Sequence, residues 1–176
     1  GEKVYLVGVS KEELGASELS FMLRESGEKN GIGGQVPLLP NPEMNITTYR
    51  ALSTAIQSGL IQTAHDCSEG GVAVAAAEMC IGGRTGADID IDGTGDASVW
   101  SRLWGESLGR FLVGVQPENE IAFIEWMSGH PITMLGTVTD TENLTISDGY
   151  DVLIDVETTA MVEAWQKTLD MTGGVA

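Results

Sequence analysis

Apolar residues open the chain in a dense run, and the spacing changes to that of a helix soon afterwards. The run over residues 3–9 predicts a buried strand. Two helix starts compete behind it. Ser10 with Glu13 fits a capping box, but Gly15 interrupts that helix, so we favour a helix over 17–25.

The middle of the chain alternates strand-like and helical segments. Helical spacing over 46–58 ends at Gly59, where a left-handed C-terminal cap is expected. A small-residue helix over 72–80 is closed by Gly82 and Gly83. The short apolar or alternating segments predict strands at 60–64, 87–91, 111–115, 132–138, 144–146 and 152–156.

Three further helices are predicted in the second half. One spans 97–104, and a closing helix runs through Met161, Trp165 and Leu169. The clearest has Pro117 at its first position and Gly129 after its end. We expect its apolar face to lie in the core, and that face consists of Ile121, Ile124, Trp126 and Met127.

Glycine and proline mark the connections. They are dense enough over residues 26–45 to exclude regular structure along most of that stretch, and such long connections are often functional. Asp148-Gly149 is a strong hairpin signal. Early alternation of helices and strands followed by a strand meander favours an α+β fold, a mixed sheet covered by helices, in one domain over 1–176.

Charge and composition narrow the function. The 176 residues are 42% hydrophobic and 20% charged, as in an ordinary globular domain, but 26 acidic against 9 basic side chains give a net charge of −17. The few cations are scattered, which excludes a nucleic-acid partner. We interpret the acidity as a well-solvated surface, with adaptation to high salt as the alternative.

The chain shows no sign of a membrane or of disulfides. Its longest apolar stretch, 72–79, is far shorter than a membrane-spanning helix needs, and no secretory signal opens the sequence. We therefore expect a cytoplasmic protein or a segment cut from a longer one. Cys67 and Cys80 lack further zinc ligands and are expected to be reduced structural thiols.

Candidate chemistry is concentrated between residues 65 and 72. Gly70 and Gly71 precede a helix, and paired glycines let backbone N–H groups approach a phosphate while the helix start supplies unpaired donors and partial positive charge. Ser68 adds a hydroxyl donor. The pattern predicts an anion site, although two glycines before a helix are weakly specific.

The neighbouring polar residues have two interpretations each. His65 either contacts a phosphate or ribose hydroxyl or satisfies the local turn. Asp66 either holds magnesium or caps the helix, and Glu69 three residues later favours the cap. Whether the chain itself binds a metal stays open.

Three motifs carry a family resemblance. The segment His65-Asp66-Cys67-Ser68-Glu69-Gly70-Gly71, continuing to Met79, resembles the His-Asp-x-Ser-Asp-Gly-Gly signature of the second AIR-synthase-like C-terminal domain of the phosphoribosylformylglycinamidine synthase family. Residues 9–18 and 104–111 resemble two further family motifs in the same order. Glu69, Val72 and Ala16 depart from the pattern, and Ala16 implies strain if the family requires a positive φ there.

The resemblance implies an ATP-dependent, amidine-forming ligase of purine biosynthesis. In that family Mg-ATP activates formylglycinamide ribonucleotide, and ammonia from a glutaminase partner forms the amidine. It implies partners as well: a missing ATP-binding portion of the same chain, a glutaminase subunit and a small accessory subunit. The catalytic residues belong mainly to the missing portion, so we expect the isolated domain to be inactive.

The resulting candidate residues fall into two groups. The phosphate- or nucleotide-binding set is His65, Asp66, Ser68, Glu69, Gly70 and Gly71, and the cleft-lining set is Ser17, Glu18 and Arg110. Simpler roles compete for the second set. Glu106 and Arg110 are four apart and favour a pair on a helix, while Ser17 and Glu18 suit a helix start.

Other functions compete with the ligase. AIR synthase and selenophosphate synthetase are ATP-using relatives, and a noncatalytic dimerisation or structural module would use the glycine turn only for folding. A homodimer is compatible with the sequence. Trp100, Trp104 and Met127 suit a core as well as an interface.

Overall fold

One mixed sheet of seven strands organises the protein, in a computed structural model that describes residues 1–25, 34–38 and 42–167. The strands lie in the order β2-β4-β1-β5-β3-β6-β7, and β3 pairs with β6 in parallel among otherwise antiparallel neighbours. Their bounds are β1 (Lys3–Val7), β2 (Thr63–Asp66), β3 (Gly86–Asp90), β4 (Phe111–Val115), β5 (Ile132–Thr139), β6 (Asn143–Asp148) and β7 (Asp151–Glu157). The predicted α+β class is confirmed.

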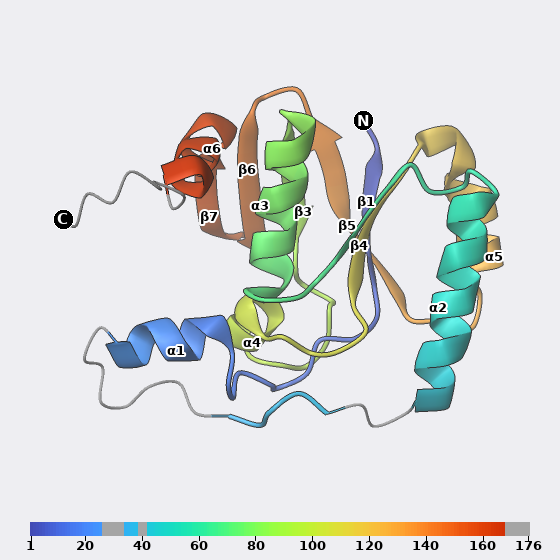
Figure 1. Cartoon of the computed structure of the whole chain (residues 1–176). Helices are drawn as coiled ribbons and strands as arrows, with labels where there is room; N and C mark the ends of the chain where they lie inside the picture. The colour runs from blue at the N-terminus through green and yellow to red at the C-terminus, as the bar shows by residue number, and fades with distance from the viewer. Residues whose placement is uncertain (26–33, 39–41, 168–176) are drawn as a thin grey trace.

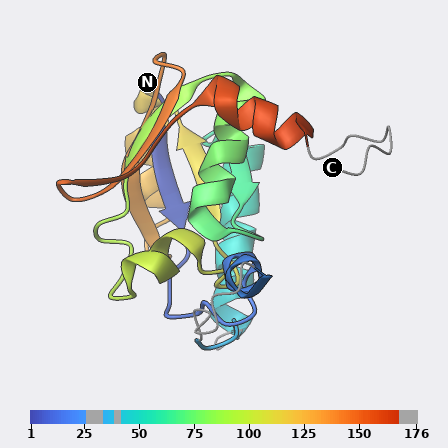
Figure 2. The ribbon, with the colours of Figure 1, turned by 90° about the vertical axis from the view of Figure 1, so that its left-hand side faces the viewer.

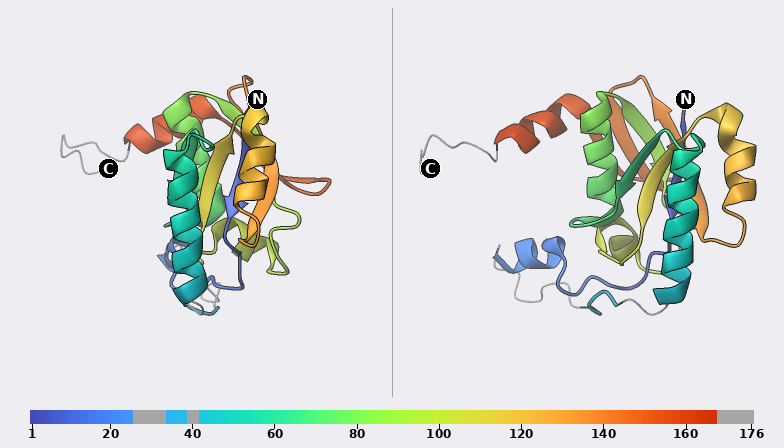
Figure 3. Two further views of the ribbon diagram at one scale, coloured as in Figure 1. Left: turned by 90° about the vertical axis from the view of Figure 1, so that its right-hand side faces the viewer. Right: turned by 45° about the vertical axis from the view of Figure 1, so that its right-hand side comes forward.

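Helices pack on both faces of this sheet. In Figure 1, α3, α4 and α6 lie on one side of the strands, and α2 and α5 lie on the other. Figure 2 shows α1 beyond the lower end of α3, and Figure 3 shows α2 and α5 side by side. The helices are α1 (Glu18–Glu25), α2 (Pro42–Gln57), α3 (Gly71–Gly83), α4 (Val99–Trp104), α5 (Glu120–Trp126) after a 3-10 turn (Pro117–Asn119), and α6 (Thr158–Lys167).

The central strand β1 divides two cores. Val4 and Leu6 face the α3 side, while Tyr5 and Val7 face α2 and α5. All four are buried, because successive side chains of a strand point to opposite faces and both faces here are covered. This explains why β1 appears in the sequence as a dense apolar run.

Several predicted boundaries shift. Strand 111–115 is confirmed as β4, but the strand predicted at 60–64 is β2 at Thr63–Asp66. The helix predicted from 46 begins at Pro42, within the stretch expected to be irregular. Residues 26–33 and 39–41 of that stretch, and Leu169 of the predicted closing helix, lie outside the described residues.

Backbone turns follow the glycine signals closely. Gly59, Gly129 and Gly149 all have positive φ, as their positions after two helices and in the β6–β7 hairpin require. Ala16 also has a positive φ, of 59°, so the strain expected from its Cβ is present. The predicted closure of α3 by Gly82 and Gly83 is wrong. The residue at the C-terminal cap is Arg84, whose φ of 53° is left-handed.

The predicted core face of α5 is wrong in part. Ile121 is 74% exposed, and Ile124 and Trp126 are about half exposed. Met127 is fully buried as predicted, and so is Phe123, which the prediction left out and whose ring lies 5.0 Å from that of Tyr5. Elsewhere, Trp100 is largely exposed and Trp104 packs partly against the α3 core.

The length and apolar character of the described helices decide whether any of them could span a membrane. None of those within 1–25, 34–38 and 42–167 combines the length and apolar character required to span one.

Candidate functional site

The glycine turn connects the edge strand β2 to α3. Cys67 N–H donates to the Arg110 carbonyl at 2.9 Å as β2 ends, and Gly71 N–H donates to the Ser68 carbonyl at 3.0 Å. Gly70 is the N-cap residue in the left-handed conformation, without a side-chain cap. The expected capping role of Asp66 is therefore wrong. Asp66 is the last residue of β2, and its carboxylate accepts a short hydrogen bond from the Ser68 hydroxyl, which lowers the pKa of Asp66.

Both glycines of the turn are required by close packing. A Cβ at Gly71 would lie 2.5 Å from the Gly105 carbonyl oxygen and 2.7 Å from that of Leu103, at the end of α4. A Cβ at Gly70 would overlap the Val74 side chain. Since both residues also have positive φ, the space that the sequence suggests for a ligand at Gly71 is taken by α4.

The carboxylate of Glu106 places a negative charge of the protein itself at the turn. Its Oε1 accepts the Gly70 N–H at 3.0 Å and the Glu18 N–H at 2.8 Å. One carboxylate oxygen thus joins the start of α1 to the start of α3, where the helix dipoles favour negative charge. The expected helical pairing of Glu106 with Arg110 is wrong, because α4 ends at Trp104.

Arg110 is a buried structural residue on the wall of the site. Its side chain is almost fully buried, and burial lowers its pKa. Nε donates to the Ser107 carbonyl at 3.1 Å, Nη1 donates to the Ser10 hydroxyl at 3.0 Å, and Nη2 makes a short hydrogen bond to the Gly105 carbonyl. With these neutral acceptors its guanidinium holds the 105–110 loop in place and does not reach into solvent for a phosphate.

Ser17 and Glu18 serve a helix start. The buried Ser17 hydroxyl accepts the Ser20 N–H at 3.2 Å, and Glu18 opens α1 as its acidic first residue. The favoured start of this helix is confirmed, and the alternative start at Ser10 is not helical. Glu18 contacts the turn only through its N–H on Glu106.

A hollow of about 640 Å³, which we call the turn pocket, opens beside these residues. It brings Asp66, Ser68 and Glu69 together with Glu106, and Arg110 forms part of its wall. Three carboxylates oppose a bare phosphate, whereas carboxylate oxygens are ligands that Mg²⁺ accepts. Among the described residues no group of three His, Cys, Asp or Glu side chains is close enough to enclose a metal ion by itself.

His65 lies apart from the turn pocket. Its Nδ1 is 2.7 Å from the Asp66 carbonyl oxygen and its Nε2 is 3.2 Å from Glu78 Oε2 on α3. It lines a different hollow under α3, and it does not line the turn pocket. The structure therefore brings Asp66, Ser68 and Glu69 together around the turn pocket, while His65 stays beside Asp66, with its Nδ1 3.9 Å from Asp66 Oδ1, but does not line that pocket.

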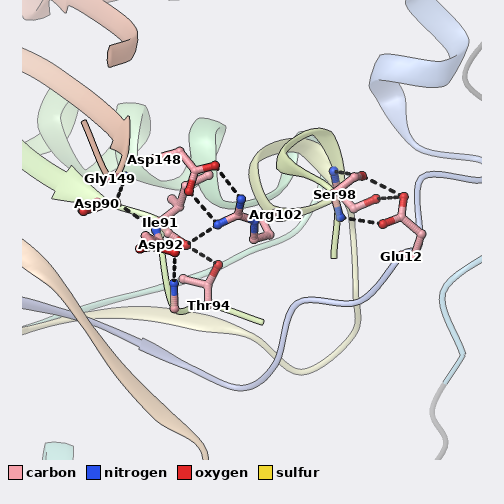
Figure 4. Close-up of polar contacts among 11 residues, drawn as sticks. Glu12, Asp90, Ile91, Asp92, Thr94, Ser98, Arg102, Asp148 and Gly149 are labelled. Atoms are coloured by element: carbon pink, nitrogen blue, oxygen red, sulfur yellow. Dashed lines mark hydrogen bonds and ion pairs between the residues drawn. The ribbon is translucent and has the colours of Figure 1, made fainter. Parts of the chain in front are cut away.

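A polar cluster at α4 escaped the sequence reasoning (Figure 4). Glu12 accepts hydrogen bonds from the Ser98 N–H at 2.7 Å, the Ser98 hydroxyl at 2.8 Å and the Ser101 hydroxyl at 2.7 Å, and these lower the pKa of Glu12. Arg102 binds Asp148 through both terminal nitrogens, at 2.8 and 2.6 Å. Serine is a favoured N-cap residue, which is a signal for Ser98 that the prediction of the 97–104 helix did not use, but its partner Glu12 lies 86 residues away.

The cysteines are free and buried, as expected. Burial raises the pKa of both the Cys67 and the Cys80 thiol to about 11. Neither is poised as a nucleophile at neutral pH.

Comparison with known proteins gives a family and a fold. The family model of the AIR synthase related protein, C-terminal domain, matches residues 1–149. PurL from T. maritima in complex with FGAR has a TM-score of 0.71 at 20% identity, over 92% of this chain and 27% of that one. PurL in complex with ATP gives 0.67 at 19% over 92% and 26%, and HypE from E. coli, a hydrogenase maturation protein, gives 0.58 at 12% over 89% and 48%. The chain thus spans about a quarter of the PurL chains it matches, and at these identities the likeness shows the fold.

Proposed function

Because the family model covers residues 1–149, the chain belongs to the AIR synthase related protein C-terminal domain family, and we propose that it is this domain of a PurL-type phosphoribosylformylglycinamidine synthase. The observation that carries the proposal is the fold match to PurL over 92% of the chain, at a TM-score of 0.71 compared with 0.58 for HypE. The three sequence motifs support the same choice.

In this proposal the full-length enzyme uses Mg-ATP and ammonia to convert formylglycinamide ribonucleotide into the amidine. T. maritima PurL has been captured with ATP and with FGAR, which supports nucleotide and ribonucleotide binding by such a fold. The turn pocket contributes the Ser68 hydroxyl as a donor and Asp66 and Glu69 as acceptors. Magnesium would supply the positive charge that the pocket lacks, since the Arg110 guanidinium is buried and bonded within its own loop.

A further contribution from the protein is positional. Glu106 already binds the Gly70 N–H, so this donor holds α3 and α1 in register and is not available to a phosphate unless the carboxylate withdraws. Tyr49 also brings a hydroxyl to this pocket, but Ser68 lies on the turn itself, and its hydroxyl can rotate from Asp66 towards a ligand. We therefore assign phosphate contact to Ser68 ahead of the glycines.

The end of the domain that carries the turn also fits a larger enzyme. In Figure 1, α1, α4, the start of α2 and the start of α3 lie together at one end. Large apolar side chains on these elements and on the segment between them are about half exposed or more: Phe21, Met22, Val36, Leu38, Met44 and Trp100. Such a surface is typical of an interface, and we assign it to the ATP-binding portion of the longer chain. The glutaminase, the small accessory subunit and a cytoplasmic location enter through the family resemblance.

The test uses the longer parent chain, supplied with Mg-ATP, formylglycinamide ribonucleotide and ammonia. We expect ADP release that depends on the ribonucleotide. Ser68→Ala should lower kcat/KM by roughly tenfold or more, because a hydrogen bond to a charged group contributes about 1.5–3 kcal/mol. Ser53→Ala, at an exposed serine of α2, is the matched control.

The outcomes separate the alternatives. Ribonucleotide-independent ADP release would overturn the ligase assignment and favour another ATP-using relative such as AIR synthase, selenophosphate synthetase or a HypE-like protein. If Ser68→Ala behaves like Ser53→Ala in an active enzyme, the turn is only structural. Activity of the 176-residue chain alone would contradict the expectation that the isolated domain is inactive.

A further inference from the structure

A second hollow, which we call the α3 cavity, lies on the same side of the sheet as α3 but towards the other end of that helix. It has a volume of about 510 Å³ and shares no lining residue with the turn pocket. On α3 it is lined by residues from Ala76 to Gly83, and on the sheet by Val4, Ala64, Ala87, Leu112 and Val138.

Small side chains create this cavity. Ala76 on α3 faces Ala64 and Ala87 on the strands, so the helix and the sheet do not fill the space between them. Protein interiors are otherwise packed at the density of organic crystals. The floor belongs to the core, since Val4 and Leu112 are 5% and 0% exposed, while Ala64 and Val138 form an accessible wall. An apolar guest would therefore cover apolar surface that is now open.

The rim of the α3 cavity is polar and acidic. Within the part of the chain that the structure describes, its titratable side chains include Glu2, Glu78 and His65, and neither lysine nor arginine lines it. Both ring nitrogens of His65 face oxygen atoms of the protein, Nδ1 the Asp66 carbonyl at 2.7 Å and Nε2 Glu78 Oε2 at 3.2 Å, so its contacts are made within the rim. Among the described residues Glu2 has no ion-pair partner, and its carboxylate accepts from the neutral Gln116 at 2.8 Å and lies close to Thr63.

We propose that the α3 cavity binds a small organic cation, consisting of an aromatic ring or short branched chain that carries an ammonium group. Its volume lies within the usual range of about 300–1,000 Å³ for small-molecule sites. The apolar floor accommodates the body of the ligand, and the Glu2 carboxylate at the rim binds the ammonium group. The proposal rests on the cavity alone and does not depend on the proposed ligase function.

The probe is 2-phenylethylamine, with phenylacetate as an anion of similar shape, titrated into the 176-residue chain at low salt. We expect the amine to bind with a millimolar or lower Kd, to shift the amide signals of Ala64, Ala76 and Ala87, and to bind at least about tenfold more tightly than the anion. Ala76→Leu should fill the cavity and abolish binding. Ala64→Leu, at an exposed edge position, tests the same point if the first variant is poorly folded.

Two controls complete the design. Ala160→Leu, on the exposed side of α6, should leave the affinity unchanged, and Glu2→Gln should reduce the preference for the amine over the anion by at least threefold. The proposal is overturned if neither compound binds, if phenylacetate binds as tightly as the amine, or if both cavity-filling variants retain wild-type affinity.

Discussion

The two ends of α3 both depend on small residues, but with opposite results. At the start of the helix, Gly71 lets the end of α4 approach until no atom can be added, and a Cβ at Gly70 would overlap Val74 of α3 itself. Towards its end, Ala76 and Gly82 leave space, and an added Cβ at Gly82 would meet nothing within 4 Å. The helix is thus fixed at its first turn and loosely packed at its last turns.

This difference shows that small residues have no structural meaning apart from their surroundings. At the turn, positive φ and a neighbouring carbonyl make glycine obligatory. In the α3 cavity, the small side chains leave a space that larger side chains could fill. The tight end carries the polar groups of the turn pocket, which suits a site that requires fixed geometry.

Substitution of the glycines tests the contrast between the two ends of α3 with the largest expected effect. Gly71→Ala should lower the free energy of unfolding by about 3 kcal/mol or more, because the new Cβ meets the Gly105 carbonyl in a left-handed conformation. Gly82→Ala should raise it by roughly 0.5–1 kcal/mol, since alanine is favoured in a helix and the position is open. Denaturant unfolding of both variants measures this, and equal changes would refute the contrast between the two ends.

Glu106 tests whether the tight end depends on its internal anion. Glu106→Ala leaves the N–H groups of Gly70 and Glu18 without their acceptor, and we expect a loss of about 1–3 kcal/mol in unfolding free energy. Glu106→Gln keeps an oxygen acceptor and should lose less than half as much. Denaturant unfolding together with the amide chemical shift of Gly70 provides the measurement. A Gln variant as unstable as the Ala variant would show that charge, and not the hydrogen bonds, joins α1 to α3.

The alkylation rates of the two thiols compare the two ends of α3 with the smallest expected effect. Cys67 lines the turn pocket and Cys80 lines the α3 cavity, and burial raises the pKa of both to about 11. Alkylation by iodoacetamide should therefore be slow at pH 8 and accelerate about tenfold per pH unit up to pH 10, because the thiolate is the reactive form. Mass spectrometry of the folded protein follows each site. Ala76→Leu should slow Cys80 and spare Cys67, and a pH-independent rate would contradict the raised pKa values.

Much of the fold could be predicted because its signals are local. The run at 111–115 and the glycines at 59, 129 and 149 determine a strand and three turns within a few residues of chain. The face of α5 could not be predicted in this way. Apolar residues surround that short helix on nearly every side, so packing in the core, such as that of Phe123 against Tyr5, selects Phe123 over Ile121 and Ile124.

The candidate site, like the fold, combines features that the local sequence predicts with contacts that it does not predict. The polar residues and glycines between β2 and α3 predict the turn. The interpretation of Asp66 as a cap, however, requires a helix that starts at residue 67, whereas the N-cap residue of α3 is Gly70. The roles of Glu106 and Glu12 depend on partners 36 and 86 residues away, at Gly70 and Ser98. No local pattern encodes such contacts.

The central position of β1 has a consequence for biosynthesis. Its apolar residues are among the first of this domain to leave the ribosome, yet its pairing partners are β4 and β5, which follow only at Phe111–Val115 and Ile132–Thr139. Until then the strand lacks both of its pairing partners, although the covering helices α2 and α3 precede β4 in the chain, and unpaired apolar strands are prone to aggregate. The central part of the sheet can therefore form only after most of this domain has been translated, and such long-range pairing predicts slow folding.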